Sequence, residues 1–130
     1  MSDRSGRSAL HYAAASGDVQ RVRELIRSGL SVADADSFGF TPLHFAAQST
    51  SPAVVRALVA AGANIEAENK FGNSPLFVAV MEYRGVPGSA VEVLLELGAD
   101  PQHQNHYGKS PRDVANMIAN YDVAKYFGAK

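Results

Sequence analysis

Residues 41–47 read Thr-Pro-Leu-His-Phe-Ala-Ala, and the start of this segment returns at regular intervals along the chain. The four versions begin at positions 8, 41, 74 and 110, so the intervals are 33, 33 and 36 residues. They are Ser8-Ala9-Leu10-His11, Thr41-Pro42-Leu43-His44, Ser74-Pro75-Leu76-Phe77 and Ser110-Pro111-Arg112-Asp113. A glycine stands two residues before each version, at Gly6, Gly39, Gly72 and Gly108. This period indicates stacked supersecondary units, with three extra residues inserted in the third unit.

The residues around each version predict a turn followed by a helix. An Asp or Asn stands three residues before each glycine, as Asp36 does before Gly39, and this spacing is typical of a β-turn. Glycine is suited to such a turn because it tolerates positive φ. Thr41 then caps a predicted helix over about 42–48, and Pro42 suits the first helical position.

Apolar residues spaced i, i+3 and i+4 predict a second helix in each unit. The triplets are Val22, Leu25 and Ile26; Val55, Leu58 and Val59; and Val91, Leu94 and Leu95. Gly62 follows the end of the second of these helices, and Ser89 with Glu92 predicts a capping box at the third. A unit of this size cannot bury its apolar face alone, so the units must stack.

These features together resemble the ankyrin repeat, through the glycine turn, Thr-Pro-Leu-His-x-Ala-Ala at 41–47 and Val-x-x-Leu-Val-x-x-Gly-Ala at 55–63. The resemblance implies an all-α solenoid of stacked helix-turn-helix units with β-turn fingers, forming a single domain over 1–130. It divides the chain into repeats 3–35, 36–68 and 69–104 and a degenerate C-terminal capping repeat, 105–127. Phe77 departs from the family pattern by replacing His, and Arg112-Asp113 departs by replacing Leu-His.

The composition argues against several classes of function. The 130 residues carry 12 Lys and Arg against 13 Asp and Glu, and this balance lacks the excess of cations that nucleic-acid binding needs. Zero cysteines exclude a disulfide framework and a thiolate metal site. No apolar run approaches the ~18 residues of a membrane span, and no secretory signal is visible. We therefore expect a cytoplasmic protein that contacts neither a membrane nor nucleic acid.

Histidines supply the main candidates for chemistry. His11 and His44 hold the motif position that is structural in the ankyrin family, where the imidazole ties one turn to the next. His103 and His106 form a His-Gln-Asn-His segment that could ligate a metal ion, although a closed zinc site needs four ligands. We interpret both as histidines of a surface loop and expect no catalytic residue, no metal site and no cofactor. A metal-dependent enzyme using His103 and His106 is the less favoured alternative.

The resemblance places partner binding in a concave groove formed by the turn tips and the exposed faces of the first helices. Phe38, Phe71 and Tyr107 hold the same place in three successive turns, where an aromatic ring either contacts a partner or stiffens the adjacent turn. Tyr83 and Arg84 lead into the inserted residues, and both residue types are common interface anchors. The candidate partner-binding residues are Phe38, Phe40, Phe71, Tyr107, Met81, Tyr83, Arg84, Lys70 and Gln48.

These features lead us to expect a non-catalytic protein–protein interaction module that is a monomer when unbound. It would act by occupying the surface of another protein, as an inhibitor or immunity-type protein that blocks a toxin or an enzyme. The alternative is an adaptor or regulatory subunit of a cytoplasmic complex. One tight enzyme partner would favour the first role, and several weaker partners would favour the second.

Overall fold

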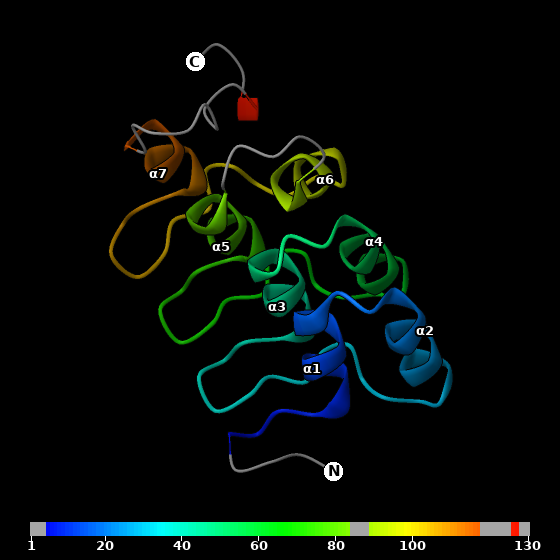
Figure 1. Ribbon diagram of the computed structural model, residues 1–130. Coiled ribbons are helices and arrows are strands. Elements are labelled where there is room, and N and C mark those ends of the chain that lie inside the picture. The colour runs from blue at the N-terminus through cyan, green and yellow to red at the C-terminus, as the bar shows by residue number, and fades with distance from the viewer. Residues whose placement is uncertain (1–4, 84–88, 118–125, 128–130) are drawn as a thin grey trace.

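A computed structural model describes residues 5–83, 89–117 and 126–127 of the chain. Within these residues there is no strand, and the helices are α1 (Ala9–Ser16), α2 (Val19–Arg27), α3 (Pro42–Gln48), α4 (Pro52–Ala60), α5 (Pro75–Glu82), α6 (Ala90–Glu96) and α7 (Pro111–Met117). Figure 1 shows α1, α3, α5 and α7 in one layer and α2, α4 and α6 in a second. Three loops project from the first layer, on the left of the view. The expected all-α solenoid is confirmed.

Short polar residues and prolines begin the helices. The Thr41 hydroxyl accepts the His44 N–H at 3.4 Å, and Pro42 opens α3, so the prediction of a helix over 42–48 is confirmed. The capping box predicted from Ser89 and Glu92 is wrong. Ser89 precedes α6, but its hydroxyl makes no capping hydrogen bond, and the Glu92 side chain interacts with the Tyr126 hydroxyl.

The core lies between the two helix layers. The first two members of each predicted apolar triplet are buried, namely Val22, Leu25, Val55, Leu58, Val91 and Leu94, and the third members pack half-buried at the edge. Ala46 and Ala47 of α3 are fully buried, and α3 packs against both α1 and α5. Their small side chains allow these backbones to approach closely. Each buried leucine contributes roughly 1.5–3 kcal/mol relative to an exposed one, so the stacking of units supplies most of the stability.

The projecting loops are tight hairpins over 36–40, 69–73 and 105–109. In the first, the Asp36 N–H donates to the Phe40 carbonyl at 2.8 Å, and the Gly39 N–H donates to the Asp36 carbonyl at 3.0 Å. The Asp36 carboxylate accepts the N–H groups of Phe38 and Phe40, both at 2.9 Å. Burial alone would raise the pKa of Asp36, but these backbone hydrogen bonds and the Arg7 side chain outweigh it and lower the pKa.

Backbone hydrogen bonds also join each hairpin to the next. The Lys70 N–H donates to the Phe38 carbonyl at 2.8 Å, and the His106 N–H donates to the Phe71 carbonyl at 3.0 Å. Gly39 makes the first of these contacts possible, because a Cβ there would lie 2.8 Å from the Lys70 nitrogen and 2.9 Å from the Asn69 Cα. Gly39 also has a φ of +82°, as its place in the turn predicts. The hairpins therefore form one rigid row.

Two glycines of the second unit allow the cost of backbone strain to be measured apart from the cost of a clash with the next hairpin. Gly62 has a φ of +100°, and a Cβ there would meet no atom within 4 Å. We expect Gly62→Ala to lower the free energy of unfolding by about 1 kcal/mol, through strain alone. Gly39→Ala adds a clash with backbone atoms and should cost at least about 1 kcal/mol more. Urea denaturation measures both costs, and equal losses would contradict close packing of the hairpins.

Candidate functional site

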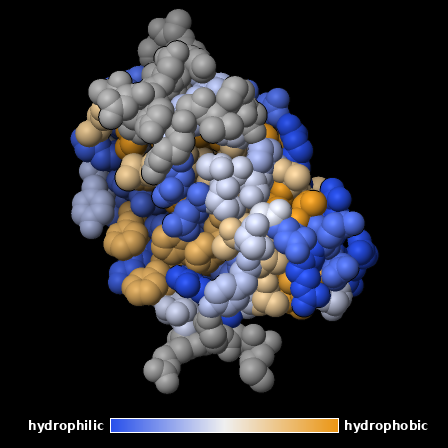
Figure 2. Space-filling model, viewed as in Figure 1, coloured by the Kyte–Doolittle hydropathy of each residue, from blue (hydrophilic) through white to orange (hydrophobic). Residues whose placement is uncertain are grey.

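Three of the predicted aromatic residues are exposed on successive hairpins. Phe38 is 45% exposed, Phe71 40% and Tyr107 73%. With Lys70, they form what we call the hairpin surface. Figure 2 shows apolar side chains gathered along this edge of the molecule, on the left of the view. The row of interhairpin hydrogen bonds fixes the spacing of these side chains.

Lys70 lies between two of these rings. Its ammonium nitrogen is 4.8 Å from the ring centroid of Phe38 and 6.0 Å from that of Phe71. An ammonium group over an aromatic face is attracted by the ring's electron density, by about 0.5–1 kcal/mol at an exposed site. Phe38 therefore contacts Lys70 of the next hairpin, as the stiffening alternative expects. Phe38 and Phe71 also keep much of their surface exposed, so contact with a partner stays a prediction.

A pocket of about 310 Å³ lies beside the hairpin surface and is lined by Arg7, Phe40, Phe45 and Gln48. Phe40 is half-buried, and its ring packs against Phe45 with centroids 5.6 Å apart. The Arg7 guanidinium lies 5.0 Å from the Phe45 ring centroid. Phe40 and Gln48 are thus brought together by the fold in the lining of one pocket, where Phe40 is half-buried and Gln48 is exposed.

The first-layer helices add exposed side chains to the same side. Met81 of α5, one of the predicted residues, is 53% exposed. The sequence interpretation missed Tyr12 of α1, which is 48% exposed, and Phe45 of α3. Each directly follows the motif histidine of its repeat, and this shared position could have indicated both residues from the sequence.

Tyr83 is not a surface residue, and its prediction as a partner contact is wrong. Its side chain is 2% exposed, and its ring meets that of Tyr126 edge to face, with centroids 5.7 Å apart. The two hydroxyl groups lie 3.3 Å apart. Tyr83 therefore joins the end of α5 to the C-terminal part of the chain. Arg84, the residue predicted beside it, lies outside the described residues.

Two histidines hold the hairpins against the first-layer helices, as expected. Nδ1 of His44 accepts the Thr41 N–H at 3.1 Å, and Nε2 lies 2.9 Å from the Asn73 carbonyl oxygen. Because a backbone N–H can only donate and a carbonyl can only accept, the ring is neutral with its proton on Nε2. Burial lowers the pKa of His44, which favours the same neutral form. His11 makes the equivalent bonds to the Ser8 N–H and the Phe40 carbonyl, each at 3.0 Å.

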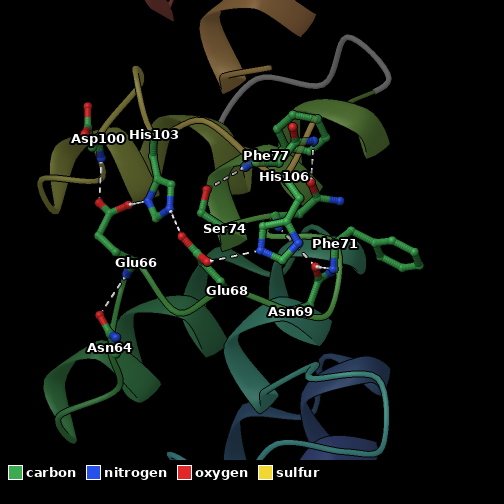
Figure 3. Close-up of polar contacts among 12 residues, drawn as sticks. Asn64, Glu66, Glu68, Asn69, Phe71, Ser74, Phe77, Asp100, His103 and His106 are labelled. Atoms are coloured by element: carbon green, nitrogen blue, oxygen red, sulfur yellow. Dashed lines mark hydrogen bonds and ion pairs between the residues drawn. The ribbon is translucent and has the colours of Figure 1, made fainter. Parts of the chain in front are cut away.

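His103 has the opposite arrangement (Figure 3). Its Nδ1 lies 2.7 Å from a Glu66 carboxylate oxygen, and its Nε2 lies 2.7 Å from a Glu68 carboxylate oxygen. Both partners accept hydrogen bonds, so the ring carries both protons and a positive charge. Burial alone would lower the pKa of His103, but the hydrogen bonds to Glu68 and Glu66 outweigh it and raise the pKa.

His103 lies in a loop, as interpreted from the sequence, and this cluster adds contacts that the sequence did not indicate. His103 joins the segment before the 69–73 hairpin to the segment before the 105–109 hairpin, and Glu66 also accepts the Asp100 N–H at 2.7 Å. His106 is exposed, with its Nε2 3.7 Å from a Glu68 oxygen. Among the described residues, no three His, Cys, Asp or Glu side chains are grouped so as to hold a metal ion.

The comparisons with known proteins agree with this architecture. A family model described as ankyrin repeats, in three copies, matches residues 1–69. The match covers more than half of the chain, and the protein therefore belongs to the ankyrin repeat family, whose repeats indicate a protein–protein interaction module. No curated protein matches the chain. Within the part of the chain that the structure describes, every helix is too short or too polar to cross a membrane.

The charged state of His103 predicts a pH-dependent contribution to stability. A raised pKa means that the folded state holds the proton more tightly than the unfolded state. The contribution is therefore fully present below about pH 6.5, the ordinary pKa of histidine, and is lost as the pH rises through the raised pKa. We expect His103→Gln to cost about 0.5 kcal/mol or more near pH 6 and clearly less near pH 9.

Urea denaturation of the wild type and His103→Gln at several pH values measures this difference. The matched control is His106→Gln, because His106 lies farther from Glu68 and is exposed, so its cost should be smaller at every pH. A cost of His103→Gln that stays constant or grows above pH 7 would contradict a charged imidazole held by Glu66 and Glu68.

Proposed function

We propose that the protein binds a partner protein through the hairpin surface and the adjoining pocket. The observation that carries this proposal is the row of exposed aromatic side chains, Phe38, Phe71 and Tyr107, on hairpins locked together by backbone hydrogen bonds. Exposed aromatic residues on a rigid support lose little conformational entropy on binding, which is why they serve as interface anchors. Met81 and Gln48 extend the surface onto the first-layer helices.

We further propose that the protein acts without catalysis, by covering the partner's surface. His11 and His44 use both ring nitrogens in structural hydrogen bonds, and His103 uses both in contacts with Glu66 and Glu68. These engagements give little support to the alternative of a metal-dependent enzyme built on His103 and His106. In this proposal the module works in the cytoplasm, because a chain with no cysteine has no disulfide that would need an oxidising compartment. The module is a monomer when unbound.

Within this class, we favour an inhibitor or immunity-type protein that blocks a toxin or an enzyme. A rigid row of anchors can cover a partner's surface without any catalytic group of its own. The alternative is an adaptor or regulatory subunit. Co-purification distinguishes them, because an inhibitor should return one stoichiometric enzyme and an adaptor several weaker partners.

Substitution of one anchor tests the site. Phe71 exposes part of its ring, and its contact with the next hairpin is made by its backbone carbonyl, so Phe71→Ala should leave the fold nearly unchanged. We expect it to weaken binding of the co-purified partner by about 2 kcal/mol or more, as hot-spot residues do. Titration calorimetry measures the affinity, and a melting curve measures the stability of the same sample.

The matched control is Arg23→Ala, because Arg23 is exposed on α2 in the second layer, away from the hairpins. It should change neither affinity nor melting temperature appreciably. Loss of binding in Arg23→Ala with full binding in Phe71→Ala would place the partner on the second-layer helices and refute the proposed site.

A further inference from the structure

Cations outnumber carboxylates among the described turn residues. Among the described residues, three of the four turns carry a cation, at Arg7, Lys70 and Lys109. The described turn residues include one carboxylate, Asp36, which is buried and held by backbone N–H groups and by Arg7. The protein has a net charge of −1, so the net charge of the described turn residues is opposite in sign to that of the whole chain.

The carboxylates of the described chain lie mostly elsewhere. Glu66 and Glu68 face His103, Glu96 pairs with Arg56 between α6 and α4, and Asp18 and Glu24 belong to the α2 region. The first-layer helices contribute Glu82, which is half-buried, and Asp113, whose carboxylate accepts the Ser110 N–H at 2.9 Å. Within the described residues, no carboxylate lies within ion-pair distance of Lys70 or Lys109.

Lys70 is the most specific feature of this surface. Its ammonium lies 4.8 Å from the Phe38 ring centroid and 6.0 Å from that of Phe71, so a positive charge is presented between two apolar groups. A carboxylate that approached Lys70 would therefore lie close to the Phe38 and Phe71 rings. Exclusion of water by those rings would strengthen the ion pair, because Coulomb attraction grows as the local dielectric constant falls.

From this arrangement we propose that the partner segment that docks on the hairpin surface is acidic, with carboxylates flanked by apolar side chains. This inference rests on the proposed function and names the chemistry of its partner. One carboxylate pairs with Lys70, and its apolar neighbours contact Phe38 and Phe71. Lys109, on another turn, attracts further acidic groups and speeds the first encounter.

A single-stranded nucleic acid could also offer negative charge and flat rings, but this surface favours a protein. The cations are single and separated, one to a turn, and do not form the continuous basic track that follows a phosphate backbone. The Lys70 ammonium also lies over one face of Phe38, where a base would have to stack.

Selection of peptides on the whole protein tests the proposal. The probe is a phage-displayed library of random short peptides, panned on the immobilised full chain at low salt. We expect the recovered peptides to be enriched in Asp and Glu next to Leu, Phe or Trp. Their binding should weaken by at least about tenfold in Lys70→Glu and in Phe71→Ala, and should weaken in high salt. Lys70→Met should have an intermediate effect, because it removes the charge but keeps the length of the side chain.

The control is Arg23→Glu, which reverses a charge on the second-layer face and should leave peptide binding within about twofold of the wild type. Melting curves of each variant exclude loss of the fold as the cause. Acidic peptides that depend on Lys70 and Phe71 but not on Arg23 support the proposal.

The failures are distinguishable. Peptides that depend on Phe71 but show no enrichment in Asp and Glu overturn the acidic partner and leave the hairpin surface as the binding site. Peptides that are displaced by a single-stranded oligonucleotide overturn the choice of a protein partner. Peptides that depend on Arg23 and not on Phe71 overturn both this inference and the proposed function. Recovery of no peptide above background overturns the inference alone, because Phe71→Ala with the co-purified partner still tests the site.

Discussion

In the second unit, the imidazole of His44 connects the start of α3 to the next hairpin. Its Nδ1 accepts the Thr41 N–H at the start of α3, its Nε2 donates to the Asn73 carbonyl at the base of the next hairpin, and the ring itself is fully buried. These two hydrogen bonds require a neutral ring, because a protonated Nδ1 could not accept a hydrogen bond from the Thr41 N–H. Because Asn73 closes the 69–73 hairpin, the position of Lys70 and Phe71 depends on this ring together with the interhairpin hydrogen bonds.

The C-terminal side of the stack uses different chemistry for the same task. Phe77 stands where the histidine would be, and it has no polar atom to reach the 105–109 hairpin. The contact is made instead by the Asn105 amide, which donates to the Asn73 side chain at 2.8 Å, and by the charged His103 between Glu66 and Glu68. Acid weakens the neutral bridge of His44 and preserves the charged one of His103, whereas base does the reverse. The two interfaces therefore respond to pH in opposite directions.

Much of this architecture follows from local sequence. The bounds of α3 and the positive φ of Gly39 depend on residues within a few positions of each other, where capping and turn chemistry are specific. The structural use of His44 follows from the resemblance to the ankyrin repeat, because its partner Asn73 lies 29 residues away. The contacts of His103 and Tyr83, which the sequence does not indicate, are made with residues far away in the chain. His103 meets carboxylates 35 and 37 residues away, and Tyr83 meets Tyr126 43 residues away. Nothing in the local pattern of Tyr83, beside an insertion rich in glycine, indicates that its ring turns inward. The sequence could have indicated Tyr12 and Phe45 as surface candidates, because each directly follows the motif histidine of its repeat.

The neutral imidazole of His44 orders the hairpin that carries the proposed binding surface. Native-state hydrogen exchange on His44→Phe, which copies the residue of the third unit, tests it directly. The substitution leaves the Thr41 N–H and the Asn73 carbonyl without their partner. We predict that the amide protons of Lys70 and Gly72 exchange at least about tenfold faster, while that of Val22 in α2 changes much less. Unchanged protection at Lys70 and Gly72, or an equal loss at all three, would contradict the claim.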